Sequence, residues 1–162
     1  MVILGIDPGS TRVGYGLIRK NKSGILFLES GLLAITAKEK NERLMQLEKS
    51  FSSLLRRTKP ELAVVEKLYF VKNVKTGMSV AESRGVLTLL LIQHKIPILE
   101  FTPLEIKVAL TGYGKSDKKM MMRAAMKVLG ITKIQGGDDA ADALGAALAG
   151  ISYPLRLRLT KI

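Results

Sequence analysis

The sequence predicts an α/β fold in which helices pack around a sheet. Two observations lead to this prediction. Three stretches rich in branched and aromatic residues open the chain, and beyond them apolar residues at helical spacing alternate with short apolar runs. The 162 residues contain no repeat and no linker long enough to separate two domains. We therefore expect one domain over residues 1–151 and a basic C-terminal tail over residues 152–162.

The first part of the chain is expected to form strands at residues 2–7, 12–19 and 24–32. The first of these apolar runs ends at Asp7, where a Pro-Gly-Ser turn follows. A helix is expected next, because apolar residues then recur on one helical face. Thr36 and Glu39 have the spacing of a capping box at its start, and it should end before Pro60.

The second part of the chain continues the alternation. A compact apolar run at residues 62–65 is typical of a strand buried on both faces, and it ends at Glu66. A polar, basic connection then runs to about Thr76. Beyond it we expect a short strand at residues 97–99 and helices at residues 78–95, 103–110, 117–129 and 138–151.

The charge balance favours a polyanionic partner. Lysine and arginine total 26 against 14 aspartates and glutamates, giving a formal charge of +12. Nucleic acid fits this balance better than a membrane, because no basic amphipathic helix with aromatic anchors is evident and no apolar run approaches the roughly 20 residues that span a bilayer. The absence of cysteine excludes disulfides and thiolate metal sites. With no secretory signal evident, a cytoplasmic location is expected.

Acidic residues stand at positions that bring them together. Asp7 and Glu66 each end an apolar strand, and ligand-binding residues commonly collect at strand ends in open α/β sheets. A helix start supplies Asp138, Asp139 and Asp142. Asp142 shares a helical face with both Asp139 and Asp138, so spacing alone does not choose between them, and either can simply cap the helix.

A cluster of carboxylates is easier to explain by function than by structure. Without a cation, four gathered negative charges raise each other's pKa values and strain the fold. Hard divalent ions such as Mg²⁺ prefer oxygen ligands, and a pair of them can activate water and stabilise a leaving oxygen. The sequence therefore predicts a metal-dependent nuclease.

Several motifs, taken together and in order, resemble the RuvC family of Holliday junction resolvases. The N-terminal segment at residues 3–10 would be weak alone, since it also resembles the phosphate loop of actin-like ATPases. It is followed, in the family's order, by Gly14-Tyr15-Gly16, Val65-Glu66-Lys67-Leu68-Tyr69-Phe70 with Lys72-Asn73, Ser83-Arg84-Gly85-Val86, Lys107 before Gly112-Tyr113-Gly114, and Asp139-Ala140-Ala141-Asp142-Ala143-Leu144. The resemblance covers roughly residues 1–150.

This resemblance implies a ribonuclease H-like fold, with a five-stranded mixed sheet flanked by helices. It implies an endodeoxyribonuclease that resolves four-way DNA junctions by symmetric paired nicks and leaves 5′-phosphate and 3′-hydroxyl ends. Two Mg²⁺ ions, for which Mn²⁺ can substitute, would be bound by Asp7, Glu66, Asp139 and Asp142. Only the family's Asp-Ala-Ala-Asp-Ala-Leu string favours Asp139 over Asp138.

The resemblance also implies basic residues and partners. Lys107 and Lys118 match catalytic basic positions that hold the scissile phosphate or its neighbours. Tyr69 matches an aromatic that stacks on a base, although Phe70 is an alternative. The implied DNA contacts are Tyr69, Phe70, Lys72, Lys75, Arg84, Lys115 and Lys119. The implied assembly is a homodimer on a four-way junction, working with the RuvA and RuvB branch-migration proteins.

Three other functions share some of these sequence features. An actin-like ATP-binding protein needs a duplicated domain for which 162 residues leave no room, and Mg²⁺-dependent ATP binding would reveal one. A non-catalytic nucleic-acid module, with the acids as caps and surface groups, would lack metal-dependent nicking. A ribonuclease H-like nuclease acting on RNA would share the metal site and differ only in its substrate.

Overall fold

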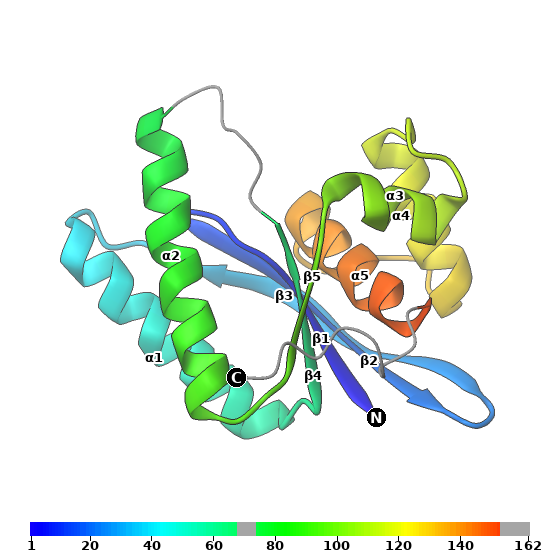
Figure 1. Cartoon of the computed structure of the whole chain (residues 1–162), viewed down its shortest axis with the longest axis horizontal. Helices are drawn as coiled ribbons and strands as arrows, with labels where there is room; N and C mark the ends of the chain where they lie inside the picture. The colour runs from blue at the N-terminus through cyan, green and yellow to red at the C-terminus, as the bar shows by residue number, and fades with distance from the viewer. Residues whose placement is uncertain (68–73, 153–162) are drawn as a thin grey trace.

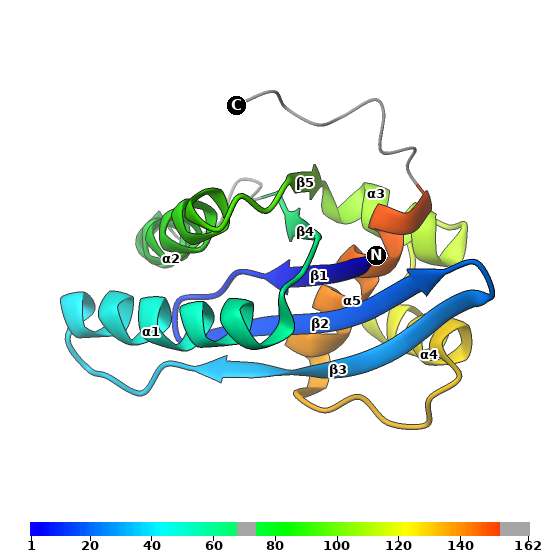
Figure 2. The same cartoon turned by 90° about the horizontal axis from the view of Figure 1, so that it is seen from below.

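The computed structural model describes residues 1–67 and 74–152. Its sheet has five strands in the order β3-β2-β1-β4-β5. Figure 2 shows the strands one above another in this order. β1 runs antiparallel to β2 and parallel to β4, so the sheet is mixed, as predicted. The strands are β1 (Val2–Asp7), β2 (Arg12–Asn21), β3 (Gly24–Ala34), β4 (Leu62–Glu66) and β5 (Ile98–Phe101), and the helices are α1 (Lys40–Thr58), α2 (Val74–Gln93), α3 (Pro103–Thr111), α4 (Lys118–Leu129) and α5 (Gly137–Ser152).

Helices cover both faces of the sheet. Figure 1 shows α1 and α2 on one side and α3, α4 and α5 on the other. Successive strand residues point to opposite faces, so Ile3 joins the core beneath α5 while Leu4 joins the core beneath α1 and α2. None of the helices in these two layers, as far as the structure describes them, is long and apolar enough to cross a membrane.

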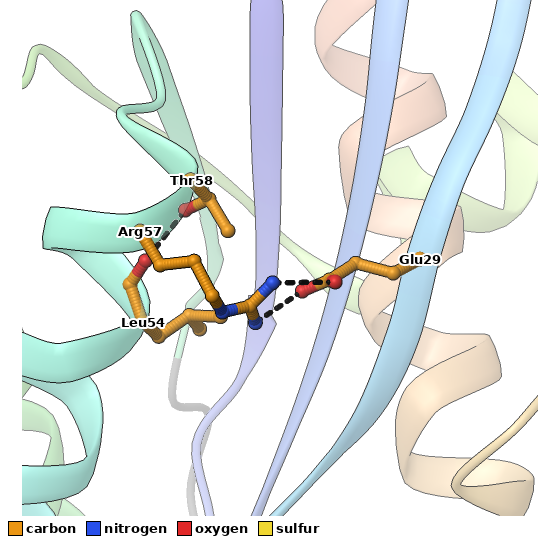
Figure 3. A network of polar contacts seen from close by, with 4 residues as sticks. All are labelled: Glu29, Leu54, Arg57 and Thr58. Atoms are coloured by element: carbon orange, nitrogen blue, oxygen red, sulfur yellow. Dashed lines mark hydrogen bonds and ion pairs between the residues drawn. The ribbon is translucent and has the colours of Figure 1, made fainter.

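The α1 and α2 face has a core of large side chains. Phe51 and Leu47 of α1 are fully buried against the sheet. At the end of α1, Arg57 donates two hydrogen bonds to the Glu29 carboxylate on β3, at 2.6 and 2.7 Å, and so ties the helix to the sheet (Figure 3). The neighbouring Thr58 hydroxyl donates to the Leu54 carbonyl oxygen at 2.7 Å, which closes the last turn of the helix.

The opposite face is built for close approach between backbones. A Cβ atom added at Gly5 would lie 1.8 Å from the carbonyl oxygen of Ala143, and one added at Gly14 would lie 2.1 Å from that of Asp139. Only glycine therefore lets α5 lie directly on β1 and β2. The close neighbour of Gly14 on this face is therefore a helix. This contact holds the first turns of α5 beside the ends of the strands.

The start of α1 differs from the prediction. The helix begins at Lys40, and its N-cap residue Glu39 makes no side-chain capping bond. The Gln46 side-chain oxygen instead accepts hydrogen bonds from the backbone N–H groups of Thr36 at 3.0 Å and Ala37 at 3.1 Å. The predicted Thr36–Glu39 capping box was wrong because a side chain from the second turn of the helix already binds these donors.

The other helix and strand boundaries differ from the predicted ones by a few residues. α2 begins at Val74 rather than at residue 78 and ends at Gln93 rather than at 95. The chain leaves it through Lys95, whose φ of 57° is left-handed and stops the helix. β2 and β3 each extend two residues beyond their predicted ends. None of these shifts moves an acidic residue away from its predicted strand end or helix start.

Candidate active site

The two strand-end acids lie at one edge of the sheet. β1 and β4 are parallel neighbours in which Ile6 pairs with Val65, and Asp7 and Glu66 are the next residues along each strand. Because Ile6 and Val65 both contribute to the core under α1 and α2, the alternation of strand side chains turns the two acids toward α5. Side-by-side parallel strands thus bring together two carboxylates that are 59 positions apart in the sequence.

Charges from α5 complete the acidic cluster. Burial raises the pKa of Asp7 from its ordinary value of 3.8 to about 7, and the negative charges of Glu66, Asp142 and Asp139 add to this rise. Burial also raises the pKa of Glu66, with Asp142 the second cause. The pKa of Asp142 is raised by burial as well. These carboxylates therefore share one partly buried site.

The structure separates Asp139 from Asp138. Asp138 is exposed, whereas the side chain of Asp139 is only 28% exposed and its charge reaches Asp7. Asp139 also forms an ion pair with Arg12, the first residue of β2, whose Nε lies 3.4 Å from Asp139 Oδ2. The sequence reasoning did not single out Arg12. In the sequence Arg12 is simply a basic residue after a turn. It lies at the acidic cluster only because β2 packs against the first turn of α5.

Two lysines face the acids from the other side. Lys118 Nζ lies 3.3 Å from Asp142 Oδ2, and this carboxylate is the main cause of a raised pKa for Lys118. Lys107 joins them in lining a cavity of about 200 Å³ whose apolar wall includes Ile106. The cavity also touches Glu66. Basic and acidic side chains thus meet in one recess that is open to solvent.

Comparison with known proteins assigns the chain to a family. The family model described as crossover junction endodeoxyribonuclease RuvC matches residues 3–150. A protein of that name from Prochlorococcus marinus is 42% identical over 152 residues, which cover 93% of this chain and 98% of the relative. The one from Petrotoga mobilis is 44% identical over 149 residues, 91% of each chain. The chain belongs to the RuvC family.

Solved structures agree with this assignment. Thermus thermophilus RuvC in complex with a Holliday junction substrate superimposes with a TM-score of 0.85 at 26% identity, covering 92% of both chains. The yeast mitochondrial Holliday junction resolvase Ydc2 superimposes with a TM-score of 0.68 at 15% identity, covering 91% of this chain and 76% of that one, which bears on the fold alone. The ribonuclease H-like fold that the RuvC resemblance implied is confirmed.

The lysines of this RuvC chain are held by short-range contacts that the sequence analysis did not identify. Thr102 and Glu105 form a capping box that starts α3 directly after β5, so Lys107 projects from its second turn. The turn between α3 and α4 is closed by the buried Ser116, whose hydroxyl lies 2.6 Å from that of Thr111. The next residue caps α4, and Lys118 is its first helical residue. A Thr-Pro-x-Glu string before a helix was the available signal for the capping box.

The start of α5 is held against β3, the strand at one edge of the sheet. Ser30 of β3 donates a hydrogen bond to the carbonyl oxygen of Gln135 at 2.9 Å. Gly136 follows with a φ of 94°, and a Cβ atom there would lie 2.8 Å from the backbone of Gly31. The turn before α5 therefore lies on β3, and this contact orients the acidic first turn toward Asp7.

The DNA contacts that the RuvC resemblance implied fall into three groups. Lys115 and Lys119 are exposed at the start of α4, on either side of Lys118. Arg84 of α2 pairs with Glu100 of β5 and has a side chain only 23% exposed, so it links helix to sheet. Tyr69, Phe70 and Lys72 lie outside the described residues, and so does the side chain of Lys75.

The donors at the acidic cluster have the chemistry of a hard-cation site. Every candidate ligand is a carboxylate, and an all-oxygen set fits Mg²⁺ or Mn²⁺ rather than a softer metal. Within residues 1–67 and 74–152, no three acidic or histidine side chains are positioned to hold a metal ion as they stand. Two of the acids, Asp139 and Asp142, are turned instead to Arg12 and Lys118.

Proposed function

We propose that this protein is a divalent-cation-dependent endonuclease that resolves four-way DNA junctions by nicking two opposing strands. One observation carries the proposal: in a chain of the RuvC family, carboxylates from β1, β4 and α5 share one solvent-accessible site in which the pKa of Asp7 is raised to about 7. A cluster of this kind gains stability when a cation binds, because the cation offsets the mutual repulsion of the acids.

We propose Asp7, Glu66, Asp139 and Asp142 as the ligands of two Mg²⁺ ions, with Mn²⁺ as a substitute. The exposure of Asp138 and the reach of the Asp139 charge to Asp7 support Asp139 as the α5 ligand nearest the helix start. Bound divalent cations supply charge stabilisation for the phosphoryl transition state and lower the pKa of the attacking water. The charges of Glu66, Asp142 and Asp139 all act on Asp7, which suits a ligand shared by both ions.

The basic side chains act on the phosphate. Lys107 and Lys118 line the cavity beside Glu66 and Asp142, so a phosphate entering it meets two ammonium groups. An ammonium is a mobile point charge that can follow the phosphate as charge shifts to the leaving oxygen. In the free protein Lys118 pairs with Asp142, and we propose that this lysine turns to the phosphate when Asp142 binds a cation.

The wider DNA path is proposed to follow the exposed lysines Lys115 and Lys119 and the segment after Glu66, with Lys72, Lys75 and Arg84 as further contacts. Tyr69 or Phe70 would stack on a base near the junction centre. A cytoplasmic homodimer would place two equivalent sites around a junction of approximate two-fold symmetry. Cooperation with RuvA and RuvB is part of the same proposal. The Thermus thermophilus relative was solved with a Holliday junction substrate, which supports the choice of DNA structure.

The proposal is tested on a synthetic four-way junction and a linear duplex of matched sequence, with and without Mg²⁺. The wild-type protein should nick the junction symmetrically, only with Mg²⁺. Asp7→Asn should reduce cleavage on the order of 1,000-fold, because a ligand of the cations is lost, while junction binding persists because repulsion of phosphate is reduced. Full cleavage by this variant, or equal cleavage of the duplex, would contradict the proposal.

A matched pair of variants tests the ligand assignment on α5. Asp139→Asn should lose cleavage as Asp7→Asn does, whereas Asp138→Asn makes the same chemical change one residue away at an exposed position and should keep it. The reverse result would move the ligand to Asp138 and leave the proposed reaction intact.

A further inference from the structure

Arg12 occupies a position at the acidic cluster that no part of the mechanism above uses. It is the first residue of β2, and Gly14 and Gly16 follow it on the strand face that α5 covers. Because alternate strand residues share a face, the Arg12 side chain projects over the first turn of α5. Its Nε lies 3.4 Å from Asp139 Oδ2, and 65% of the side chain is exposed. The guanidinium is thus both paired with an acid and open to solvent.

The placement of Arg12 mirrors that of Lys118. Lys118 pairs with Asp142 at 3.3 Å and is 67% exposed, so Asp139 and Asp142 each have one exposed basic partner, supplied by a different element. Exposed ion pairs of this kind are weak and readily exchanged. A divalent cation at Asp139 would compete with Arg12 for the same carboxylate, and the displaced guanidinium would remain beside the site.

We propose that Arg12 is a phosphate-positioning residue, which pairs with Asp139 in the free protein and turns to a DNA backbone phosphate when Asp139 binds a divalent cation. The inference rests on the proposed function, since it needs both the cation and the DNA. A guanidinium suits this role because its planar fork matches two phosphate oxygens, whereas an ammonium offers a single point charge. Arg12 from β2 and Lys118 from α4 would then both contact the DNA backbone.

The first test measures cation binding by calorimetric titration of the full-length protein with Mn²⁺, without DNA. Arg12→Gln should bind Mn²⁺ about 2- to 5-fold more tightly than the wild type, because a competitor for Asp139 is gone. Arg19→Gln is the matched control: it removes the same charge from an exposed position near the other end of β2 and should leave the affinity unchanged. Weaker Mn²⁺ binding by Arg12→Gln, together with a lower melting temperature, would make Arg12 a structural support for Asp139 and overturn the proposal.

The second test measures junction binding in EDTA and in Ca²⁺, a divalent cation with the same preference for oxygen ligands. Arg12→Gln should bind like the wild type in EDTA and less tightly in Ca²⁺, with the slope of log affinity against log salt smaller by about 1 in Ca²⁺ only. Arg12→Lys should restore the slope, since it keeps the charge, but not the full affinity, since it lacks the fork. Equal binding by the wild type and Arg12→Gln in Ca²⁺ would overturn the proposal.

These readouts separate the inference from the proposed function. If Arg12→Gln changes Mn²⁺ affinity and Ca²⁺-dependent junction binding as expected, but the wild type never cuts junctions, the proposed function fails. The proposal that Arg12 moves from Asp139 to a DNA phosphate then still stands. If the wild type cuts junctions and Arg12→Gln shows neither change, the inference about Arg12 fails alone.

Discussion

The two faces of the sheet are built from different residues and serve different ends. Beneath α1 and α2, large side chains such as Phe51 fill the space between helix and strands. Beneath α5, glycine on the strands meets alanine on the helix, and the two backbones are in contact. A side-chain core tolerates small shifts by repacking, whereas a backbone contact fixes position. The cluster of acids lies on the face where position is fixed.

The contrast teaches how a small domain places charged groups. Asp139 and Asp142 belong to a helix that the glycine contacts press against β1 and β2, so their distance from Asp7 is set by backbone rather than by flexible side chains. On the other face the charged groups tie elements together, as in the Arg57–Glu29 pair. We therefore expect changes on the α5 face to affect chemistry first and changes on the α1 and α2 face to affect stability first.

Among the changes that test this contrast, the largest effect is expected at Gly14, where an added methyl group would lie 2.1 Å from the Asp139 carbonyl oxygen. Gly14→Ala must push the first turn of α5 away from Asp7. A displacement of about 1 Å at a reacting site can cost about 100-fold in rate, and overpacking costs about 1–3 kcal/mol of stability. We expect at least that loss of junction cleavage, measured as the single-turnover nicking rate, with a lower melting temperature.

The neighbouring residue provides the control. Val13 lies beside Gly14 on β2 but points into the core under α1 and α2. Val13→Ala should cost stability to a similar extent, because it leaves a small cavity, yet cut junctions at the wild-type rate at a temperature where it is fully folded. If both variants lost cleavage equally, the difference between the two faces would not hold.

How much the sequence could predict follows from the same contrast. Asp7 and Glu66 were found because apolar runs predict strands and strand ends predict a common edge. Asp138 and Asp139 stayed unresolved from spacing because both share a helical face with Asp142. What separates them is the rotation of α5 on the sheet, which depends on the contact at Gly14 and is a tertiary property.

The ion-pair partners of Arg12 and Arg84 could not be predicted from the sequence. Among 26 basic residues, nothing local distinguishes Arg12, because its role depends on which face of β2 it occupies. The DNA contact expected of Arg84 from its motif stays a prediction, whereas its ion pair with Glu100 could not be predicted, because it depends on the pleat of β5 turning Glu100 toward α2. Local patterns identify elements and their ends, whereas the partner of a charged side chain depends on the register between elements.

The second largest effect is expected from Phe51 of α1, which is fully buried between this helix and the sheet. Phe51→Ala should lower the free energy of unfolding by about 3–5 kcal/mol, because a large cavity replaces the ring. Chemical denaturation measures this change, and the nicking rate per folded molecule should stay at the wild-type value. Met45→Ala, at a side chain of the same helix that is 71% exposed, should be within about 0.5 kcal/mol of the wild type. A slower nicking rate in folded Phe51→Ala would show that the α1 and α2 face also positions the acids.

The smallest effect concerns Asp7 and pH without divalent ions. Its pKa is about 7 in the folded protein against 3.8 ordinarily, so between these values the native state binds more protons than the unfolded state. The wild-type free energy of unfolding should therefore fall, relative to Asp7→Asn, as pH rises from about 4 through about 7.

At pH 8 we expect Asp7→Asn to be more stable than the wild type by about 1–2 kcal/mol. The full difference between the two pKa values of Asp7 sets an upper bound of about 4 kcal/mol, since each pKa unit corresponds to about 1.4 kcal/mol. Urea denaturation at pH 4, 6 and 8 measures the divergence. Mg²⁺ at pH 8 should reverse the order by stabilising the wild type more than Asp7→Asn. Parallel pH profiles for the wild type and Asp7→Asn would mean that Asp7 is neither buried nor held close to the other acids as the structure has it, and would remove the physical basis for placing cations there.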